Sequence, residues 1–176
     1  MTVKNFRLLI RMALLGLLAI FLFSYVNFRV IRVENIHAGS FSQALHEAVQ
    51  QGENFVMRSI TPFEWDKMYI FRPYTSRDEM EQLVALKWTT RNTYLGYLLE
   101  KYLLGDYALD DDSIQGIVFV KDGKVVLECT VMRNTADFTY NEKRVFECTE
   151  AKFTIEKPPN NYPLVQQIEE TDYSSL

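Results

Sequence analysis

Residues 117–127, IVFVKDGKVVL, decide the fold of this 176-residue chain. Two runs of β-branched and apolar residues flank the pair Asp122-Gly123, and both central residues of a type I′ turn take the positive φ that Asp and Gly adopt readily. We therefore predict an antiparallel β-hairpin, which places a sheet in the second half of the chain.

Further strands are expected on both sides of the hairpin. Residues 63–71, FEWDKMYIF, alternate with a period of two and predict a strand that Pro73 ends. Its aromatic face carries Phe63, Trp65, Tyr69 and Phe71. A short strand is allowed within 53–61, and a last strand is expected over about 145–156.

Three helices complete the predicted domain, over about 40–51, 76–88 and 93–104. Ser40 with Gln43, and Ser76 with Glu79, have the spacing of capping boxes and predict the starts of the first two helices. Gly52 predicts the end of the first helix, because glycine adopts the left-handed conformation that terminates many helices.

An apolar run at 8–28, LLIRMALLGLLAIFLFSYVNF, precedes this domain. At about 1.5 Å of rise per residue it just covers a hydrocarbon core of about 30 Å, and it predicts a single membrane crossing. Three basic residues, the last of them Arg11, gather at its N-terminal end, whereas Arg29 and Arg32 flank the other end, so the positive-inside rule favours a cytoplasmic N-terminus. The alternative is a cleaved secretory signal, but the small residues that cleavage requires are missing just past the run.

The expected fold class is therefore α+β. One N-terminal transmembrane helix is followed by a single domain, in which an antiparallel sheet of about four strands packs against about three helices. The expected boundaries are 1–28 for the cytoplasmic N-terminus and signal anchor, 29–39 for a juxtamembrane spacer, 40–157 for the domain and 158–176 for a loose C-terminal tail.

The two cysteines, Cys129 and Cys148, fall in the second hairpin strand and in the strand that follows it. An antiparallel return of the chain would place them opposite each other, and a disulfide would form in an oxidising compartment outside the cytoplasm. The alternative is two buried thiols that pack as small apolar side chains. We predict the disulfide.

Two stretches, WDKMYIFRPYTS at 65–76 and IVFVKDGKVV at 117–126, resemble the shared pattern of small, uncharacterised bacterial proteins that are exported as lipoproteins or held on an N-terminal anchor. The resemblance covers about residues 63–155. It implies a bacterial envelope protein with an α+β domain outside the cytoplasmic membrane, and it brings no activity, ligand or catalytic residue with it.

Composition and motifs argue against several functions. The net charge of −4 and the lack of a basic stripe argue against nucleic-acid binding. The glycine-rich phosphate loop and the nucleophile elbow are both missing from the sequence. His37 and His46 are the only histidines, and the acidic run at 110–112 lacks the spacing of a calcium loop, so neither a cofactor nor a metal site is expected.

Two functions from different classes remain. The first is non-enzymatic: a membrane-tethered domain that binds a protein or another envelope component through Trp65, Arg72 and Tyr74, because Trp, Tyr and Arg dominate interface hot spots. The second is an envelope hydrolase acting through Glu64 and Asp66, which a strand places on one face. A deep cleft between these carboxylates would favour the hydrolase, whereas a shallow apolar patch beside Arg72 would favour binding. The alternative role for Trp65 is that of a core aromatic residue.

Overall fold

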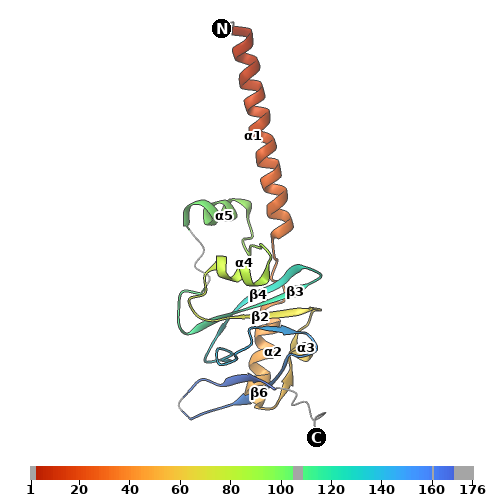
Figure 1. The fold of residues 1–176 in the computed structure, drawn as a ribbon, viewed down its shortest axis with the longest axis vertical. Helices are drawn as coiled ribbons and strands as arrows, with labels where there is room; N and C mark the ends of the chain where they lie inside the picture. The colour runs from red at the N-terminus through yellow and green to blue at the C-terminus, as the bar shows by residue number, and fades with distance from the viewer. Residues whose placement is uncertain (1–2, 105–108, 160, 169–176) are drawn as a thin grey trace.

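The computed structural model describes residues 3–104, 109–159 and 161–168 (Figure 1). Its helices are α1 (Val3–Ile31), α2 (Ala38–Gln51), α3 (Met57–Ile60), α4 (Arg77–Val84), α5 (Tyr94–Leu99) and the π-helix η1 (Glu100–Leu104). Its strands are β1 (Phe55–Val56), β2 (Lys67–Phe71), β3 (Ile114–Lys121), β4 (Lys124–Met132), β5 (Val145–Glu147), β6 (Lys152–Glu156) and β7 (Leu164–Gln167). Helix α1 projects from the domain, and the other elements gather beyond its C-terminal end.

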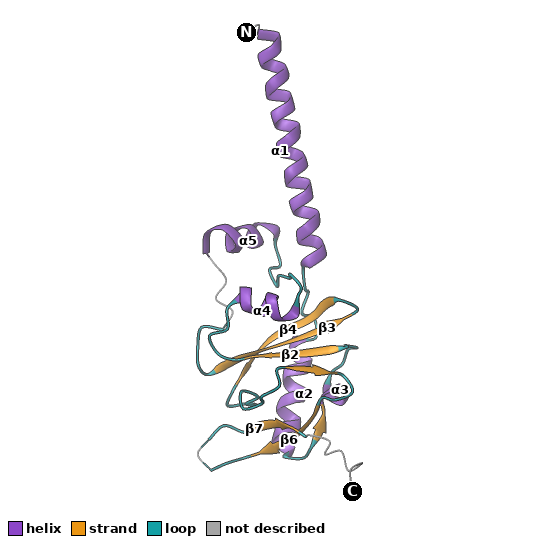
Figure 2. Cartoon of the chain, in the orientation of Figure 1, coloured by secondary structure: helices purple, strands orange, loops and turns teal. Residues whose placement is uncertain are grey.

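Two antiparallel sheets form the domain, one with the strand order β4-β3-β2-β5 and the other with the order β1-β6-β7. In Figure 2 the larger sheet crosses the middle of the domain. Helices α4 and α5 lie on the side toward α1, whereas α2, α3 and the smaller sheet lie on the side away from it. This arrangement confirms the predicted α+β class and adds a second sheet to it.

Both faces of the larger sheet are buried. The core on the side away from α1 includes Phe41, Leu45, Met57, Met68, Phe119, Phe146 and Phe153. The core on the side toward α1 includes Tyr69, Phe71, Met80, Val84, Trp88 and Val118. Because neither face is left to solvent, β3 is a nearly continuous apolar run instead of an alternating one.

The local signals in the sequence are confirmed where they depend on a few neighbouring residues. Asp122 and Gly123 have φ values of 48° and 69°, as the type I′ turn requires. Ser76 and Glu79 form the predicted capping box at the start of α4, and Gly52 ends α2 with a φ of 73°.

The strand expected over 63–71 was too long. Only Lys67–Phe71 forms β2, because residues 61–66 follow an irregular path before the ladder begins. The alternation restarts at β2, so the expected aromatic face is divided between the two cores. Phe63 and Trp65 pack on the side away from α1, and Tyr69 and Phe71 pack on the side toward it.

Two expected helix features also differ. Helix α2 begins at Ala38 with His37 as its N-cap, so Ser40 lies inside the helix, donates to the His37 carbonyl at 3.0 Å and forms no capping box. Helix α4 ends at Val84, because Ala85 takes a left-handed conformation with a φ of 59°. Trp88 therefore lies beyond the helix, and it is buried.

The last expected strand, over 145–156, is two strands that belong to different sheets. A turn at 148–151 carries the chain from β5 to β6, and the carbonyl of Ala151 accepts the backbone N–H of Met57 at 2.8 Å. Strand β7 then pairs with β6 inside the range expected to be a loose tail, where Val165 is fully buried. The rest of that expected tail, 169–176, lies outside the described residues.

The segment after the apolar helix is bonded to the domain and is not the extended spacer that was expected over 29–39. Helix α1 continues to Ile31, and its stretch Leu9–Ile31 is long and apolar enough to cross a membrane. The N–H of Val33 donates to the Thr89 carbonyl at 2.9 Å, and the N–H of Thr89 donates to the Ile31 carbonyl at 3.0 Å. These two bonds attach the domain directly to the end of α1.

Candidate binding site

The three residues predicted to bind a partner do not lie together. Trp65 precedes β2, whereas Arg72 and Tyr74 follow it, so the five residues of β2 separate them by about 17 Å. Trp65 is 3% exposed and packs in a core, as the alternative role anticipated. Tyr74 is 67% exposed. The two ends of β2 are therefore separate candidate sites.

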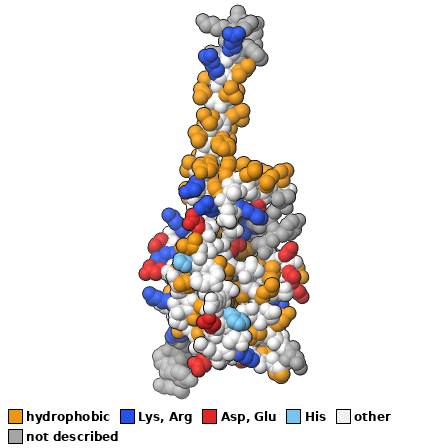
Figure 3. All heavy atoms as spheres, turned by 180° about the vertical axis from the view of Figure 1, so that it is seen from behind, with side chains coloured by type: hydrophobic (Ala, Val, Ile, Leu, Met, Phe, Trp, Pro, Cys, Tyr) orange, Lys and Arg blue, Asp and Glu red, His pale blue; other side chains and the backbone are white. Residues whose placement is uncertain are grey.

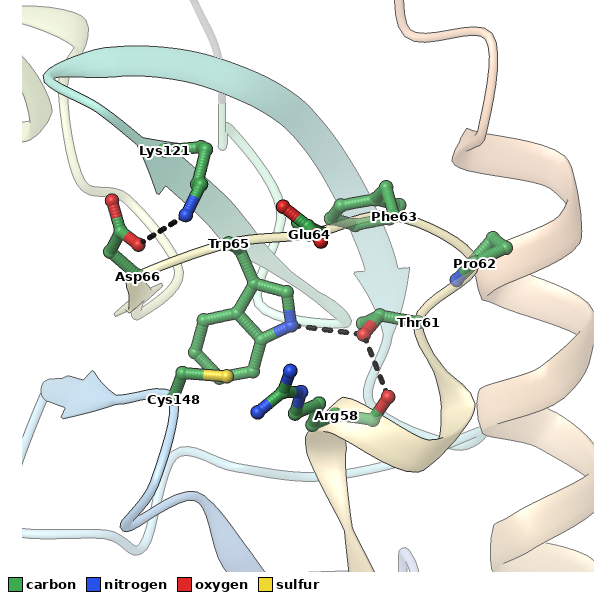
Figure 4. A pocket seen from close by; sticks show the side chains of 9 residues that line it. All are labelled: Arg58, Thr61, Pro62, Phe63, Glu64, Trp65, Asp66, Lys121 and Cys148. Carbon is green, nitrogen blue, oxygen red and sulfur yellow. Dashed lines mark hydrogen bonds and ion pairs between the residues drawn. The ribbon is translucent and has the colours of Figure 1, made fainter.

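An open cavity of about 570 Å³ lies at the Trp65 end of β2 (Figure 4). Its lining residues are Arg58, Thr61, Pro62, Phe63, Glu64, Trp65, Asp66, Lys121 and Cys148. They come from α3, from the irregular loop 61–66, from the end of β3 and from the turn after β5. The cavity thus combines an aromatic wall with two basic and two acidic side chains.

Aromatic packing fixes the loop that forms this cavity. The rings of Phe63 and Trp65 meet the ring of Phe119 edge to face, at centroid distances of 5.2 Å and 5.1 Å. The Trp65 Nε1–H donates to Thr61 Oγ1 at 2.9 Å, and that hydroxyl donates in turn to the Arg58 carbonyl at 3.2 Å. The buried indole therefore serves as the rigid wall of the cavity.

Arg58 supplies the cation of this site. It follows Met57, which is fully buried, on the single turn of α3, and its own side chain is exposed. Among the residues that the structure describes, its guanidinium has neither an ion-pair nor a hydrogen-bond partner. Figure 4 shows it beside the edge of the Trp65 indole. A planar group with five N–H donors in this position suits a carboxylate or phosphate of a ligand.

Asp66 has a structural role in the same cavity. Its Oδ1 accepts Lys121 Nζ at 3.0 Å, and its Oδ2 accepts the backbone N–H of Asp122 at 2.8 Å. The hydrogen bond from Asp122, followed by the one from Lys121, holds the pKa of Asp66 below its ordinary value. Both oxygens are thus engaged in fixing the β3–β4 turn to the loop.

Glu64 and Asp66 do line one cavity, as the hydrolase hypothesis required. However, a carboxylate with a lowered pKa and two engaged oxygens is a poor proton donor near neutral pH. Glu64, the other carboxylate of the cavity, has no hydrogen-bond or ion-pair partner among the described residues.

The turn at the other end of β2 is held by backbone bonds. Tyr74 has a φ of 63°, unusual for a residue with a side chain, and its N–H donates to the Leu109 carbonyl at 2.7 Å. The Arg72 guanidinium donates to the Asn141 carbonyl at 3.3 Å. The exposed Tyr74 ring and a tethered arginine make this turn a second, smaller candidate surface.

The predicted disulfide between Cys129 and Cys148 is absent, and both thiols are free. Cys129 lies in β4 and Cys148 follows β5, and these strands form opposite edges of the larger sheet. Three strand spacings of about 4.8 Å put the edges about 14 Å apart, well beyond the reach of a disulfide. The prediction was wrong because the chain crosses to the far edge of the sheet instead of returning beside the hairpin.

Desolvation also makes both thiols weaker acids than an ordinary cysteine. It raises the pKa of Cys129 to about 12 and raises the pKa of Cys148 above its ordinary value. No group of three or more His, Cys, Asp or Glu side chains in the described part of the chain could hold a metal ion.

Sequence reasoning missed Arg58 because nothing in residues 53–61 distinguishes this arginine from a solvent-exposed one. Its importance depends on α3 facing the loop 61–66 and on the turn after β5, contacts that no local pattern encodes. Comparison of the chain with protein-family models, with curated proteins and with solved structures gives no match. The geometry of the cavity is therefore the basis for interpreting the site.

Proposed function

We propose that the chain is a single-pass protein of the bacterial envelope, whose domain lies outside the cytoplasm and binds a partner without catalysing a reaction. The exposed apolar helix α1 supports the membrane anchor. The basic residues that precede the apolar run support a cytoplasmic N-terminus. The resemblance of residues 63–155 to anchored bacterial proteins supports the location of the domain.

The observation that carries the binding function is the unpaired Arg58 guanidinium beside the buried Trp65 indole. Arg and Trp are the side chains that most often dominate binding energy at interfaces. The loop is rigid because Phe119 and Thr61 fix it, so little conformational entropy is lost on binding. The proposed ligand is an acidic group, a carboxylate or phosphate, on a partner protein or another envelope component.

The alternative function is the carboxylate hydrolase, and the observation in its favour is that Glu64 and Asp66 line the same cavity. The engaged oxygens of Asp66 argue against it. If Glu64→Gln and Asp66→Asn together abolished a measurable turnover of an envelope substrate, the hydrolase would replace the binding module.

The binding function is tested by replacing the exposed Glu64 with a photo-reactive amino acid in the full chain and irradiating living cells. We expect a discrete cross-linked product that Arg58→Glu abolishes. The matched control is Arg72→Glu, an equally drastic change at an exposed arginine at the other end of β2, which should leave the product intact. A product insensitive to Arg58→Glu, or lost only with Arg72→Glu, would refute the proposed site.

A further inference from the structure

Helix α5 and its continuation η1 carry an apolar stripe that no part of the described chain covers. Leu95, Leu99, Tyr102 and Leu103 are 67%, 38%, 68% and 76% exposed. Leu95 and Leu99 lie one turn apart on α5, and Tyr102 and Leu103 continue the exposed apolar surface along the π-helix η1. Scattered single apolar residues on a surface need no explanation, but a continuous stripe of this kind marks a contact site.

Aromatic contacts place this stripe beside the apolar helix α1. The ring of Tyr94, the first residue of α5, lies 5.4 Å from the rings of both Phe21 and Tyr25 and 5.6 Å from that of Phe28. Tyr97, one turn later, lies 5.5 Å from Phe28. Helix α5 is therefore docked against the C-terminal third of α1.

The position of these contacts along the axis of α1 indicates what covers the stripe. Phe21 lies ten residues before Ile31, the end of the apolar stretch, which corresponds to about 15 Å along the helix axis. In Figure 1, α5 lies beside the C-terminal end of α1, crosswise to its axis and apart from the sheets. Figure 3 shows hydrophobic side chains that continue from the stalk of α1 across the adjoining end of the domain. If α1 spans a bilayer, α5 and η1 reach the boundary of its hydrocarbon.

The polar side chains around the stripe suit a membrane surface. A cavity of about 670 Å³ between α1, α4 and α5 is lined by apolar residues of α1, such as Phe23 and Ile31, and by polar side chains of both charges, among them Lys87, Lys101, Asp78, Glu81 and Glu100. Lys101 Nζ donates to the Tyr97 hydroxyl at 3.3 Å, next to the aromatic rings. Lys101 also lies 5.3 Å from the ring of the exposed Tyr102, and a lysine and a tyrosine at such a boundary extend their polar ends toward lipid headgroups.

We infer that α5 and η1 form an interfacial helix whose stripe of Leu95, Leu99, Tyr102 and Leu103 is immersed in the leaflet from which α1 emerges. The occupant of the stripe is the lipid bilayer itself. This inference rests on the proposed anchoring by α1. The domain is then held against the membrane at two points, with the larger sheet lying between the membrane and the cavity at Arg58.

The test uses the full chain reconstituted in vesicles of phosphatidylcholine and phosphatidylglycerol, with or without bromine on the acyl chains. Tryptophan is introduced as Leu103→Trp in the stripe, as Leu17→Trp in the middle of α1, or as Tyr140→Trp. Tyr140 is 56% exposed and adjoins Asn141, which bonds to β7 on the side away from α1. The emission of the native protein, with Trp65 and Trp88, is the baseline.

We expect brominated lipid to remove most of the added emission from Leu103→Trp and from Leu17→Trp, and none of it from Tyr140→Trp. Quenching of Leu17→Trp alone would overturn the interfacial helix and leave the anchor intact. If neither were quenched, the anchor would fail and the inference with it. A second copy of the chain covering the stripe would leave Leu103→Trp unquenched, with emission that shifts as the protein-to-lipid ratio rises, and that result also overturns the inference.

Discussion

Asp66 accepts the backbone N–H of Asp122 at 2.8 Å and thereby ties the loop of the candidate site to the β3–β4 turn. The same carboxylate accepts Lys121 Nζ at 3.0 Å. One side chain therefore connects the most local feature of the fold, a two-residue hairpin turn, with a loop more than fifty residues away in sequence. The shape of the cavity depends on this tie.

The tie predicts an acid-dependent stability. Because the pKa of Asp66 is lowered in the folded state, its contribution is present above the unfolded pKa of about 3.9 and is lost as the pH falls through the folded pKa. We expect Asp66→Asn to lower the thermal midpoint at pH 7 and to flatten its decline below about pH 4. Glu64→Gln is the control, since Glu64 makes no ion pair within the described residues. If the thermal midpoints of the native protein and of Asp66→Asn declined equally at acid pH, this role of Asp66 would be contradicted.

Phe119 is the central ring of the core behind the cavity, where Phe41, Phe63 and Trp65 meet it edge to face. Phe119→Ala should lower the free energy of unfolding by about 3 to 5 kcal/mol, because it removes a fully buried ring and leaves a void. Phe119→Leu should cost less. Urea titration of the full chain in micelles measures both, and a loss below about 1 kcal/mol for the alanine variant would show that the core is packed differently.

Arg77 and Glu128 form a bidentate ion pair, with both N···O distances at 2.9 Å and both side chains largely buried. Trp88 Nε1–H also donates to Glu128, at 2.5 Å. Glu128→Ala removes the buried carboxylate that accepts from both Arg77 and Trp88 and should cost about 3 to 5 kcal/mol. Arg77→Met with Glu128→Leu should cost less than that single change, because no charge remains buried. A double variant that is less stable than Glu128→Ala would contradict this interpretation of the Arg77–Glu128 ion pair.

The thiols should differ in reactivity although both are free. At pH 8 the pKa of about 12 leaves about one Cys129 in ten thousand as thiolate, and the side chain is also buried in β4. Cys148 is partly exposed at the cavity. We expect iodoacetamide to modify Cys148 at least about tenfold faster, and unfolding to equalise the two. A linked Cys129–Cys148 peptide in non-reducing mass spectrometry would restore the disulfide that the structure lacks.

The parts of the fold that were predictable from the sequence are those encoded within a few residues. The pair Asp122-Gly123 favours its turn without contacts from the rest of the chain. Ser76 and Glu79 cap α4 because each side chain accepts the backbone N–H of the other residue. The pairing of strands depends on distant chain segments, which is why Cys148 was placed beside the hairpin when it lies at the far edge of the sheet.

The candidate site illustrates the same limit. Trp65 could be singled out by residue type, but whether it packed or was exposed depended on the break in alternation at residues 61–66. Arg58 carried no signal, because its position beside Trp65 comes from contacts between α3, the loop and the turn after β5. Tyr94 likewise gave no sign that it would meet Phe21, far away in the chain.

The central claim, that an uncleaved α1 holds the domain outside the cytoplasm, is tested most directly by labelling Tyr140→Cys in intact cells with a membrane-impermeant maleimide. Tyr140 is exposed on the side of the domain away from α1. The change is made in a Cys148→Ser chain, because Cys148 is partly exposed whereas Cys129 is buried, and the same chain without Tyr140→Cys is the control. The account predicts labelling without cell lysis, on a membrane-bound chain of the full 20.6 kDa. Labelling that requires lysis, or a labelled chain shortened by the loss of α1, would contradict it.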